Sequence, residues 1–157
     1  IPFRDSNGDI FAYQGRAFGN EKPKYITIIL DDSVPKIFGL DRVDTTSDIL
    51  VVEGPIDSLF IQNCIAVAQS DLRVPQYKDK AILVPDNEPR NREVIKQIEK
   101  AIDENYRVVV WPDYVRQKDI NDMILSGMDA LEIMDIISNN TFQGLSAKVE
   151  FQKWKKI

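Results

Sequence analysis

The sequence predicts an α/β fold in which a parallel β-sheet is flanked by helices and preceded by a small β-rich part. Largely apolar segments rich in β-branched residues occur at 49–52, 81–84 and 107–111, and turn or polar residues follow each of them. This pattern is typical of strands buried on both faces of a sheet. Residues 91–104 carry apolar side chains at helical spacing. Alternation of buried strands with such a helix indicates a parallel sheet covered on both faces.

Residues 1–47 follow a different pattern and are predicted to form short strands. Asn7 and Gly8 give a strong hairpin signal, and apolar and polar side chains alternate after them. Residues 24–30 predict another strand. The polar segment 44–48 then reads as a connector, so we place a boundary near residue 47.

Further elements of the α/β domain, residues 48–140, follow from local signals. Pro55 suits the first turn of a brief helix over 55–62, and Asn63 suits the left-handed backbone conformation that often ends a helix. The other expected elements are a strand at 64–68, a polar loop at 70–80, a helix ending at Gly127 and a helix over 130–137. Residues 141–157 are expected to form a solvated C-terminal tail. The alternative is that Trp154, which stands among lysines, contacts nucleic acid or a partner.

Acidic side chains stand at the ends of two of the predicted strands. Glu53 and Gly54 follow the strand at 49–52, while Asp86 and Glu88 follow the strand at 81–84. Ligands of open α/β sheets bind at the carboxyl ends of the strands, and glycine lets the backbone turn there. Asp57 would lie in the first turn of the next helix, where it either aids this site or complements the helix dipole.

A cluster of carboxylates repels itself unless a cation binds to it. Oxygen ligands without histidine or cysteine favour Mg²⁺ or Mn²⁺ over zinc, and the sequence contains no histidine. We therefore predict that Glu53, Asp86 and Glu88 hold a divalent cation. The competing explanation is that these acids are ordinary strand ends beside surface loops and bind no ion.

The two acidic motifs resemble the signatures of the Toprim domain, which DnaG-type primases, topoisomerases and some nucleases share. These motifs are Glu53-Gly54-x-x-Asp57 and Asp86-x-Glu88. Segments before residue 47 resemble the region that precedes Toprim in primases, namely Ile1-Pro2-Phe3-Arg4-Asp5, Gln14-Gly15-Arg16, Pro23-Lys24-Tyr25 and Ile37-Phe38-Gly39-Leu40. The residues around the two motifs, Glu53-Gly54-Pro55-Ile56-Asp57-Ser58-Leu59 and Asp86-Asn87-Glu88-Pro89-Arg90-Asn91, resemble phage-type DNA primases most. In one departure, Glu88 stands where the family usually has aspartate followed by glycine.

The resemblance implies a Toprim-like, Rossmannoid sheet and the catalytic core of a DNA primase. Such an enzyme makes short RNA primers on single-stranded DNA from ribonucleoside triphosphates, with Mg²⁺ or Mn²⁺ at Glu53, Asp86 and Glu88. A replicative helicase is an expected partner. The chain begins in what resembles the middle of a motif, so we expect it to be a C-terminal catalytic fragment.

Basic side chains are candidates for binding nucleotide or template phosphates. The candidates are Arg4, Arg16, Lys24, Arg90 and Lys118. For a single basic residue, an ordinary solvated face is the competing explanation. Asp119 either caps the next helix or acts as an outer-sphere carboxylate, and capping is the favoured interpretation.

Composition narrows the class of protein. The single cysteine, Cys64, excludes a disulfide framework, and no apolar segment reaches the length of a membrane span. We expect a soluble protein of the cytoplasm, or of the host cytoplasm if a phage encodes it. The net charge of −5 argues against a surface that coats nucleic acid, although acids gathered at a metal site weaken that objection.

Two other functions stay open at this stage. The same metal site could cleave DNA, as in a Toprim nuclease or topoisomerase. A receiver-like phosphoacceptor domain would use the paired acids Asp31 and Asp32 together with Asp86 and Lys118. That pattern leaves Glu53 and Gly54 without a role.

Overall fold

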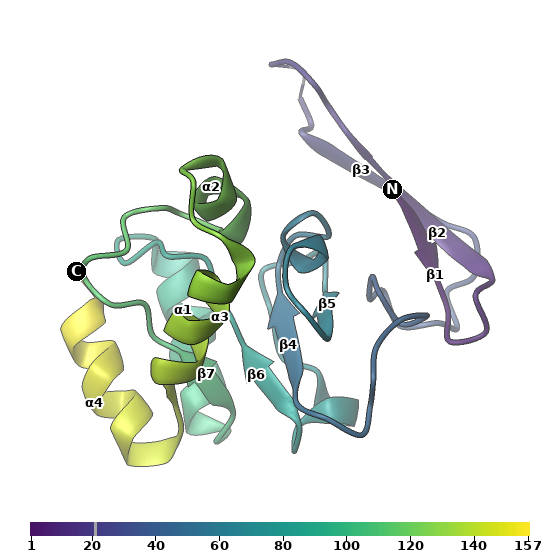
Figure 1. The fold of residues 1–157 in the computed structure, drawn as a ribbon. Helices are drawn as coiled ribbons and strands as arrows, with labels where there is room; N and C mark the ends of the chain where they lie inside the picture. The colour runs from purple at the N-terminus through teal and green to yellow at the C-terminus, as the bar shows by residue number, and fades with distance from the viewer. Residues whose placement is uncertain (21) are drawn as a thin grey trace.

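The computed structural model describes residues 1–20 and 22–157, which form two β-sheets with helices beside the second (Figure 1). The first sheet is antiparallel and contains β1 (Pro2–Arg4), β2 (Ile10–Arg16) and β3 (Tyr25–Ile29). The second has the order β5-β4-β6-β7-β8 and is parallel except where β8 joins its edge. The predicted fold class, with its small N-terminal β-rich part, is confirmed.

The elements of the second sheet alternate with turns and helices along the chain. Its strands are β4 (Ile49–Val52), β5 (Cys64–Ala66), β6 (Ala81–Leu83), β7 (Arg107–Val109) and β8 (Thr141–Phe142). The helices are α1 (Arg92–Asp103), α2 (Ile120–Leu125), α3 (Ala130–Asn139) and α4 (Gly144–Trp154), with short 3₁₀ turns η1 (Asp57–Leu59) and η2 (Pro75–Tyr77). Strand β4 is buried along its whole length, as expected for a strand covered on both faces.

Helix α1 forms where the spacing of apolar residues predicts it. The Asn91 side chain accepts hydrogen bonds from the Glu93 and Val94 amides and caps the first turn. One stripe of the helix is buried, and it consists of Ile95, Ile98, Ala101 and Ile102. The cap and this stripe together fix where the helix starts and which face it packs on the sheet.

The first sheet has a small core of its own that reaches toward the second. Phe3 and Phe11 pack edge to face with ring centres 6.1 Å apart, and Phe38 lies 5.4 Å from Phe3. Phe38 also forms a β-bridge with Ala66 at the end of β5. The connector between the sheets therefore belongs to both cores.

The prediction of a helix over 55–62 is wrong, because only the single 3₁₀ turn η1 forms there. The buried Ser58 hydroxyl donates a hydrogen bond to the Pro55 carbonyl at 2.7 Å, a local bond that competes with a regular helix. Asn63 does adopt the predicted left-handed conformation, with φ of 46°. The chain then turns directly into β5.

The C-terminal segment is not the expected solvated tail. Strand β8 pairs antiparallel with β7, and α4 packs against α1 and β7. Ala147, Phe151 and Trp154 are buried, and only 6% of the Trp154 surface is exposed. These three residues lie four and three positions apart, so they occupy one face of the helix, and burial of that face adds α4 to the core.

Candidate metal and nucleotide site

The sheet brings Glu53 and Asp86 to the same edge. Strands β4 and β6 are parallel neighbours, and Val51 lies opposite Leu83 in their register. Each acid comes shortly after its strand ends, so both emerge at the carboxyl edge of the sheet. Both side chains line one cleft of about 470 Å³. This is the location at which open α/β sheets bind ligands.

The environment raises the pKa of both carboxyl groups. Burial is the main cause at Asp86, the negative charge of Glu53 adds to it, and the pKa rises to about 7. At Glu53 burial again comes first, the charges of Glu88 and Asp119 add to it, and Lys118 opposes them. Acids held together in this way favour a positive charge among them.

Lys118 supplies a positive charge at this cluster. Its Nζ atom lies 3.4 Å from Asp86 Oδ2 and 3.7 Å from Glu88 Oε2. Burial acts to lower the Lys118 pKa, but the charges of Asp86 and Glu88 outweigh it and the pKa is raised. Lys118 therefore pairs with two acids of the cluster.

Among the described residues, no three acidic or cysteine side chains converge closely enough to hold a metal ion as they stand. Lys118 makes ion pairs with two of the candidate ligands, Asp86 and Glu88. The donor set still fits a hard cation, since it consists of carboxylate oxygens, and burial together with the charge of Glu53 raises the pKa of Asp86 although Lys118 opposes the rise. A divalent ion would require these side chains to move closer together.

Asp57 has a structural task beside the acids. Its Oδ1 accepts a hydrogen bond of 2.8 Å from the Asn121 amide in the first turn of α2. A Cβ atom at Gly54 would collide with the Asp57 carboxylate, so glycine is required there for a steric reason. Burial raises the pKa of Asp57, and the bond from Asn121 opposes that rise.

Asp119 caps helix α2, which is the role that the sequence favoured. Its side chain accepts a hydrogen bond of 2.8 Å from the Asp122 amide. It also lines the cleft, and its charge contributes to the raised pKa of Asp86. The cap orients the first turn of α2 toward the site.

Basic side chains of the first sheet form the opposite wall of the cleft. Arg16 and Lys24 line it. The Cζ atom of Arg16 and the Nζ atom of Lys24 each lie 5.7 Å from the centre of the Tyr25 ring. Lys36, from the connector, joins them and donates a hydrogen bond to the Ala68 carbonyl. The cleft therefore has an acidic wall and a basic wall.

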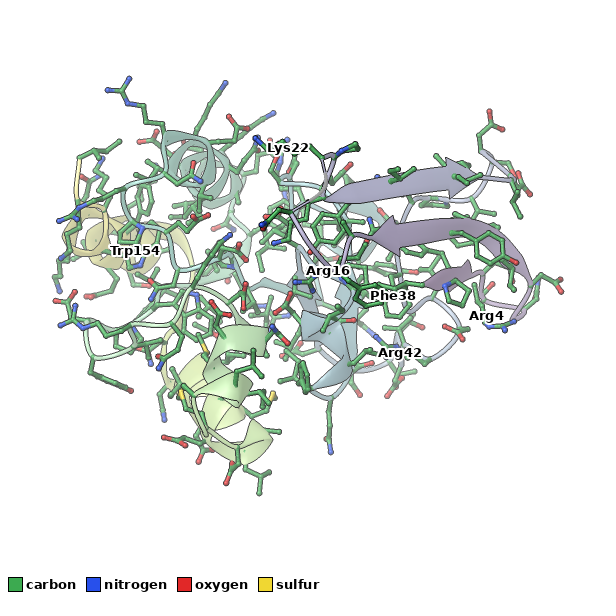
Figure 2. The ribbon with its side chains drawn as sticks, turned by 90° about the horizontal axis from the view of Figure 1, so that it is seen from above. Arg4, Arg16, Lys22, Phe38, Arg42 and Trp154 are labelled. Atoms are coloured by element: carbon green, nitrogen blue, oxygen red, sulfur yellow. The ribbon has the colours of Figure 1, made fainter. Side chains whose placement is uncertain are left out.

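Arg4 and Arg90 are not brought to this cleft. Arg4 lies at the far end of the first sheet from Arg16 and donates a hydrogen bond to the Gly8 carbonyl (Figure 2). Arg90 is exposed, and it is not among the residues that line the cleft. Glu88 is also not among the residues that line the cleft, and its Oε2 atom accepts a hydrogen bond from Asn91 Nδ2.

Sequence reasoning missed several residues at this site. Gln14 and Lys36 line the cleft, and Gln14 is 95% buried with its Oε1 atom unpaired among the described residues. Asn87, between Asp86 and Glu88, bonds to distant segments. Alternation along β2 could have placed Gln14 on the same face as Arg16, but no local signal marks the partners of Asn87.

The sequence is similar to a characterised enzyme along its whole length. It is 44% identical over 162 aligned residues to the DNA primase of Enterobacteria phage T4, an alignment that covers 100% of this chain and 47% of the phage protein. The chain belongs to the DNA primase family. It spans about half the length of this phage primase, and no family model matches it.

Solved structures agree with the fold of a primase catalytic region. A DNA primase domain from Pseudomonas aeruginosa superposes with a TM-score of 0.71 at 21% identity, covering 98% of this chain and 53% of that one. A DnaG primase catalytic domain bound to single-stranded DNA gives a TM-score of 0.69 at 19% identity, covering 95% and 53%. At these identities the likeness concerns the fold, so the family rests on the phage relative.

Proposed function

We propose that this chain is the catalytic core of a primase that joins ribonucleotides into short RNA primers on single-stranded DNA. The observation that carries the proposal is the cleft, in which Glu53 and Asp86 lie on one wall and Arg16 and Lys24 on the other. A triphosphate needs positive groups for its phosphates and a cation held by acids. The relation to the phage T4 primase supports the same activity.

The carboxylates would hold Mg²⁺ or Mn²⁺ through Glu53, Asp86 and Glu88. When bound, the ion supplies charge neutralisation at the phosphates and lowers the pKa of the primer 3′-hydroxyl. That hydroxyl attacks the α-phosphorus of the incoming nucleotide, and pyrophosphate leaves. The chain's own residues position the reactants, and no covalent nucleophile is required.

The basic wall would bind phosphate oxygens of the template or of the triphosphate. Arg16 offers a planar guanidinium that suits bidentate contact, and Lys24 offers a point charge. Lys118 balances Asp86 and Glu88 and lies within the same cleft, where a phosphate would compete for its ammonium group.

The test is template-dependent RNA synthesis with purified protein and its Glu53→Gln variant. We expect the variant to lose activity by on the order of 10²-fold or more, because a neutral amide is a poor ligand for Mg²⁺. Glu99→Gln, an equivalent change at an exposed position of α1, is the control and should keep full activity. Normal synthesis by Glu53→Gln would exclude the assigned role.

The two competing functions are not favoured. DNA cleavage would appear as nicking or relaxation of a supercoiled plasmid incubated with Mg²⁺, which provides the direct comparison. For a receiver domain, Asp31 and Asp32 would have to join Asp86, but they follow β3 of the first sheet and are exposed. They do not line the cleft that contains Asp86.

The expected partners follow from this activity. They are a single-stranded DNA template, ribonucleoside triphosphates and a replicative helicase. Among the described residues, no helix has the length and apolar character that crossing a bilayer demands. For a relative of a phage enzyme, the host cytoplasm is the proposed place of action.

A further inference from the structure

Asn87 lies between two of the proposed metal ligands, Asp86 and Glu88, and its side chain makes bonds in two directions. Its Nδ2 atom donates to the Val115 carbonyl at 2.9 Å and to the Gln117 carbonyl at 3.2 Å. Both amide hydrogens are thereby used. The side chain thus ties the loop after β6 to the segment that leads to Lys118.

The backbone of Asn87 extends this connection. Its amide donates a hydrogen bond of 2.6 Å to the carbonyl of Lys118, whose ammonium group pairs with Asp86 and Glu88. Asn87 therefore holds the backbone between the two acids against the segment that carries Lys118.

The side-chain oxygen of Asn87 connects to the C-terminal helix α4. Trp154 Nε1 donates to Asn87 Oδ1 at 3.0 Å. The indole is buried and stacks on Phe151 with ring centres 6.1 Å apart, so its position is set by α4. Two residues further along the chain, the Lys156 amide donates a hydrogen bond of 2.8 Å to the Pro89 carbonyl.

We propose that Asn87 and Trp154 are positioning residues for the metal site, through which α4 sets the spacing of Asp86 and Glu88. This inference rests on the proposed function, because it assumes that these carboxylates hold the cation. Neither residue lines the cleft, so their effect passes through the backbone of the loop. A helix outside the cleft thereby becomes part of the catalytic apparatus.

The test measures Mn²⁺ binding by calorimetry on the purified protein without nucleotide. We expect Trp154→Phe, which keeps the ring and removes the N–H donor, to weaken Mn²⁺ binding by about 3- to 10-fold. Asn87→Ala should weaken it at least as much. Because both changes break the same bond, adding Trp154→Phe to Asn87→Ala should have little further effect.

Primer synthesis gives a second readout. The Mg²⁺ concentration for half-maximal activity should rise in Trp154→Phe, while the rate at saturating Mg²⁺ stays within about twofold of the wild type. Ile133→Val, in the buried face of α3, is the control for a general loss of stability. We expect Ile133→Val to shift the unfolding temperature by about as much as Trp154→Phe does, and to leave the Mn²⁺ affinity unchanged.

The outcomes separate this inference from the proposed function. If the wild type binds Mn²⁺, Glu53→Gln weakens that binding and Trp154→Phe does not, the positioning role is overturned and the metal site stands. Equal weakening in Trp154→Phe and Ile133→Val also overturns it, since the effect would then be one of stability alone. Absence of Mn²⁺ binding by the wild type would overturn both.

Discussion

At the scale of single residues, the acidic wall of the cleft is a concentration of unfavourable charge. Asp86 is enclosed beside Glu53, and its pKa rises from 3.8 to about 7. An acid whose pKa rises on folding binds its proton more tightly in the folded state than in the unfolded state. The site therefore favours ligand binding at the expense of stability, as functional sites often do.

We predict that the stability of the metal-free protein depends on pH through Asp86. Between about pH 4 and about pH 7 the folded state holds a proton that the unfolded state has released, so the free energy of unfolding falls as pH rises. The decrease should amount to a few kcal/mol at most and end above the folded pKa. Urea unfolding at several pH values measures it.

Asp86→Asn provides the control for this pH dependence. The variant keeps the shape of the side chain and removes the titrating group, so the slope between these pH values should become shallower. Mg²⁺ should restore stability above pH 7 in the wild type but much less in the variant. A wild-type slope that the substitution leaves unchanged would assign the effect to another group.

The sequence predicted the acidic side of the site better than the basic side. Glu53 and Asp86 follow short, strongly buried strands, and parallel strands bring such positions to one edge whatever the details of the loops. Arg4 was grouped with Arg16, but it lies at the far end of its sheet (Figure 2). Residue type and alternation specify the face of a strand, and they do not specify which end meets the second domain.

At the scale of elements, the turn after β4 and the start of α2 depend on each other. Asp57 of η1 accepts the hydrogen bond from the Asn121 amide, and Gly54 leaves room for the Asp57 carboxylate. These two elements are far apart in the sequence. Their contact holds the Glu53 strand end beside the segment that carries Lys118 and Asp119.

We predict that Gly54→Ala lowers the free energy of unfolding by about 1 to 3 kcal/mol, because the new methyl group displaces Asp57 from Asn121. In an Asp57→Ser background the same substitution should cost much less, since the shorter side chain leaves space for the methyl group. Denaturant unfolding of the four proteins measures the coupling. Additive effects of the two changes would show that the collision is relieved elsewhere.

Regular elements with a continuous apolar stripe were predictable, while those that depend on tertiary partners were not. Helix α1 has both a cap and a stripe, and its ends were predicted within a residue. Helix α4 was missed because lysines surround Trp154, although Ala147 and Phe151 complete a buried face. The helix expected over 55–62 does not form although its apolar residues have helical spacing, since the Ser58 side chain makes a local hydrogen bond to the Pro55 carbonyl that interrupts it.

At the scale of the whole molecule, function depends on how two separate sheets face each other. The first sheet presents Arg16 toward the α/β domain, and Figure 2 shows this residue at the junction of the two parts. Phe38 bridges both cores, so the connector sets their separation. Sequence periodicity describes each sheet, but it gives no information on this mutual orientation.

The net charge of −5 conceals a local basic surface, and the arrangement of that surface gives the last prediction. If Arg16 and Lys24 contact phosphates, each contact releases counterions from single-stranded DNA. Removing either side chain by substitution with alanine should weaken binding and reduce the slope of log affinity against log salt by about 0.7. Fluorescence anisotropy with a labelled oligonucleotide at several salt concentrations measures the slope.

Arg4→Ala is a matched control because it removes the same charge from the same sheet, away from the cleft. Screening over a distance of about 10 Å at 0.1 M salt confines its influence, so the slope should stay close to that of the wild type. If the binding depended on total charge alone, all three variants would change the slope equally. A difference between Arg4 and the pair Arg16 and Lys24 would show that the nucleic acid lies in the cleft, opposite the acidic strand ends.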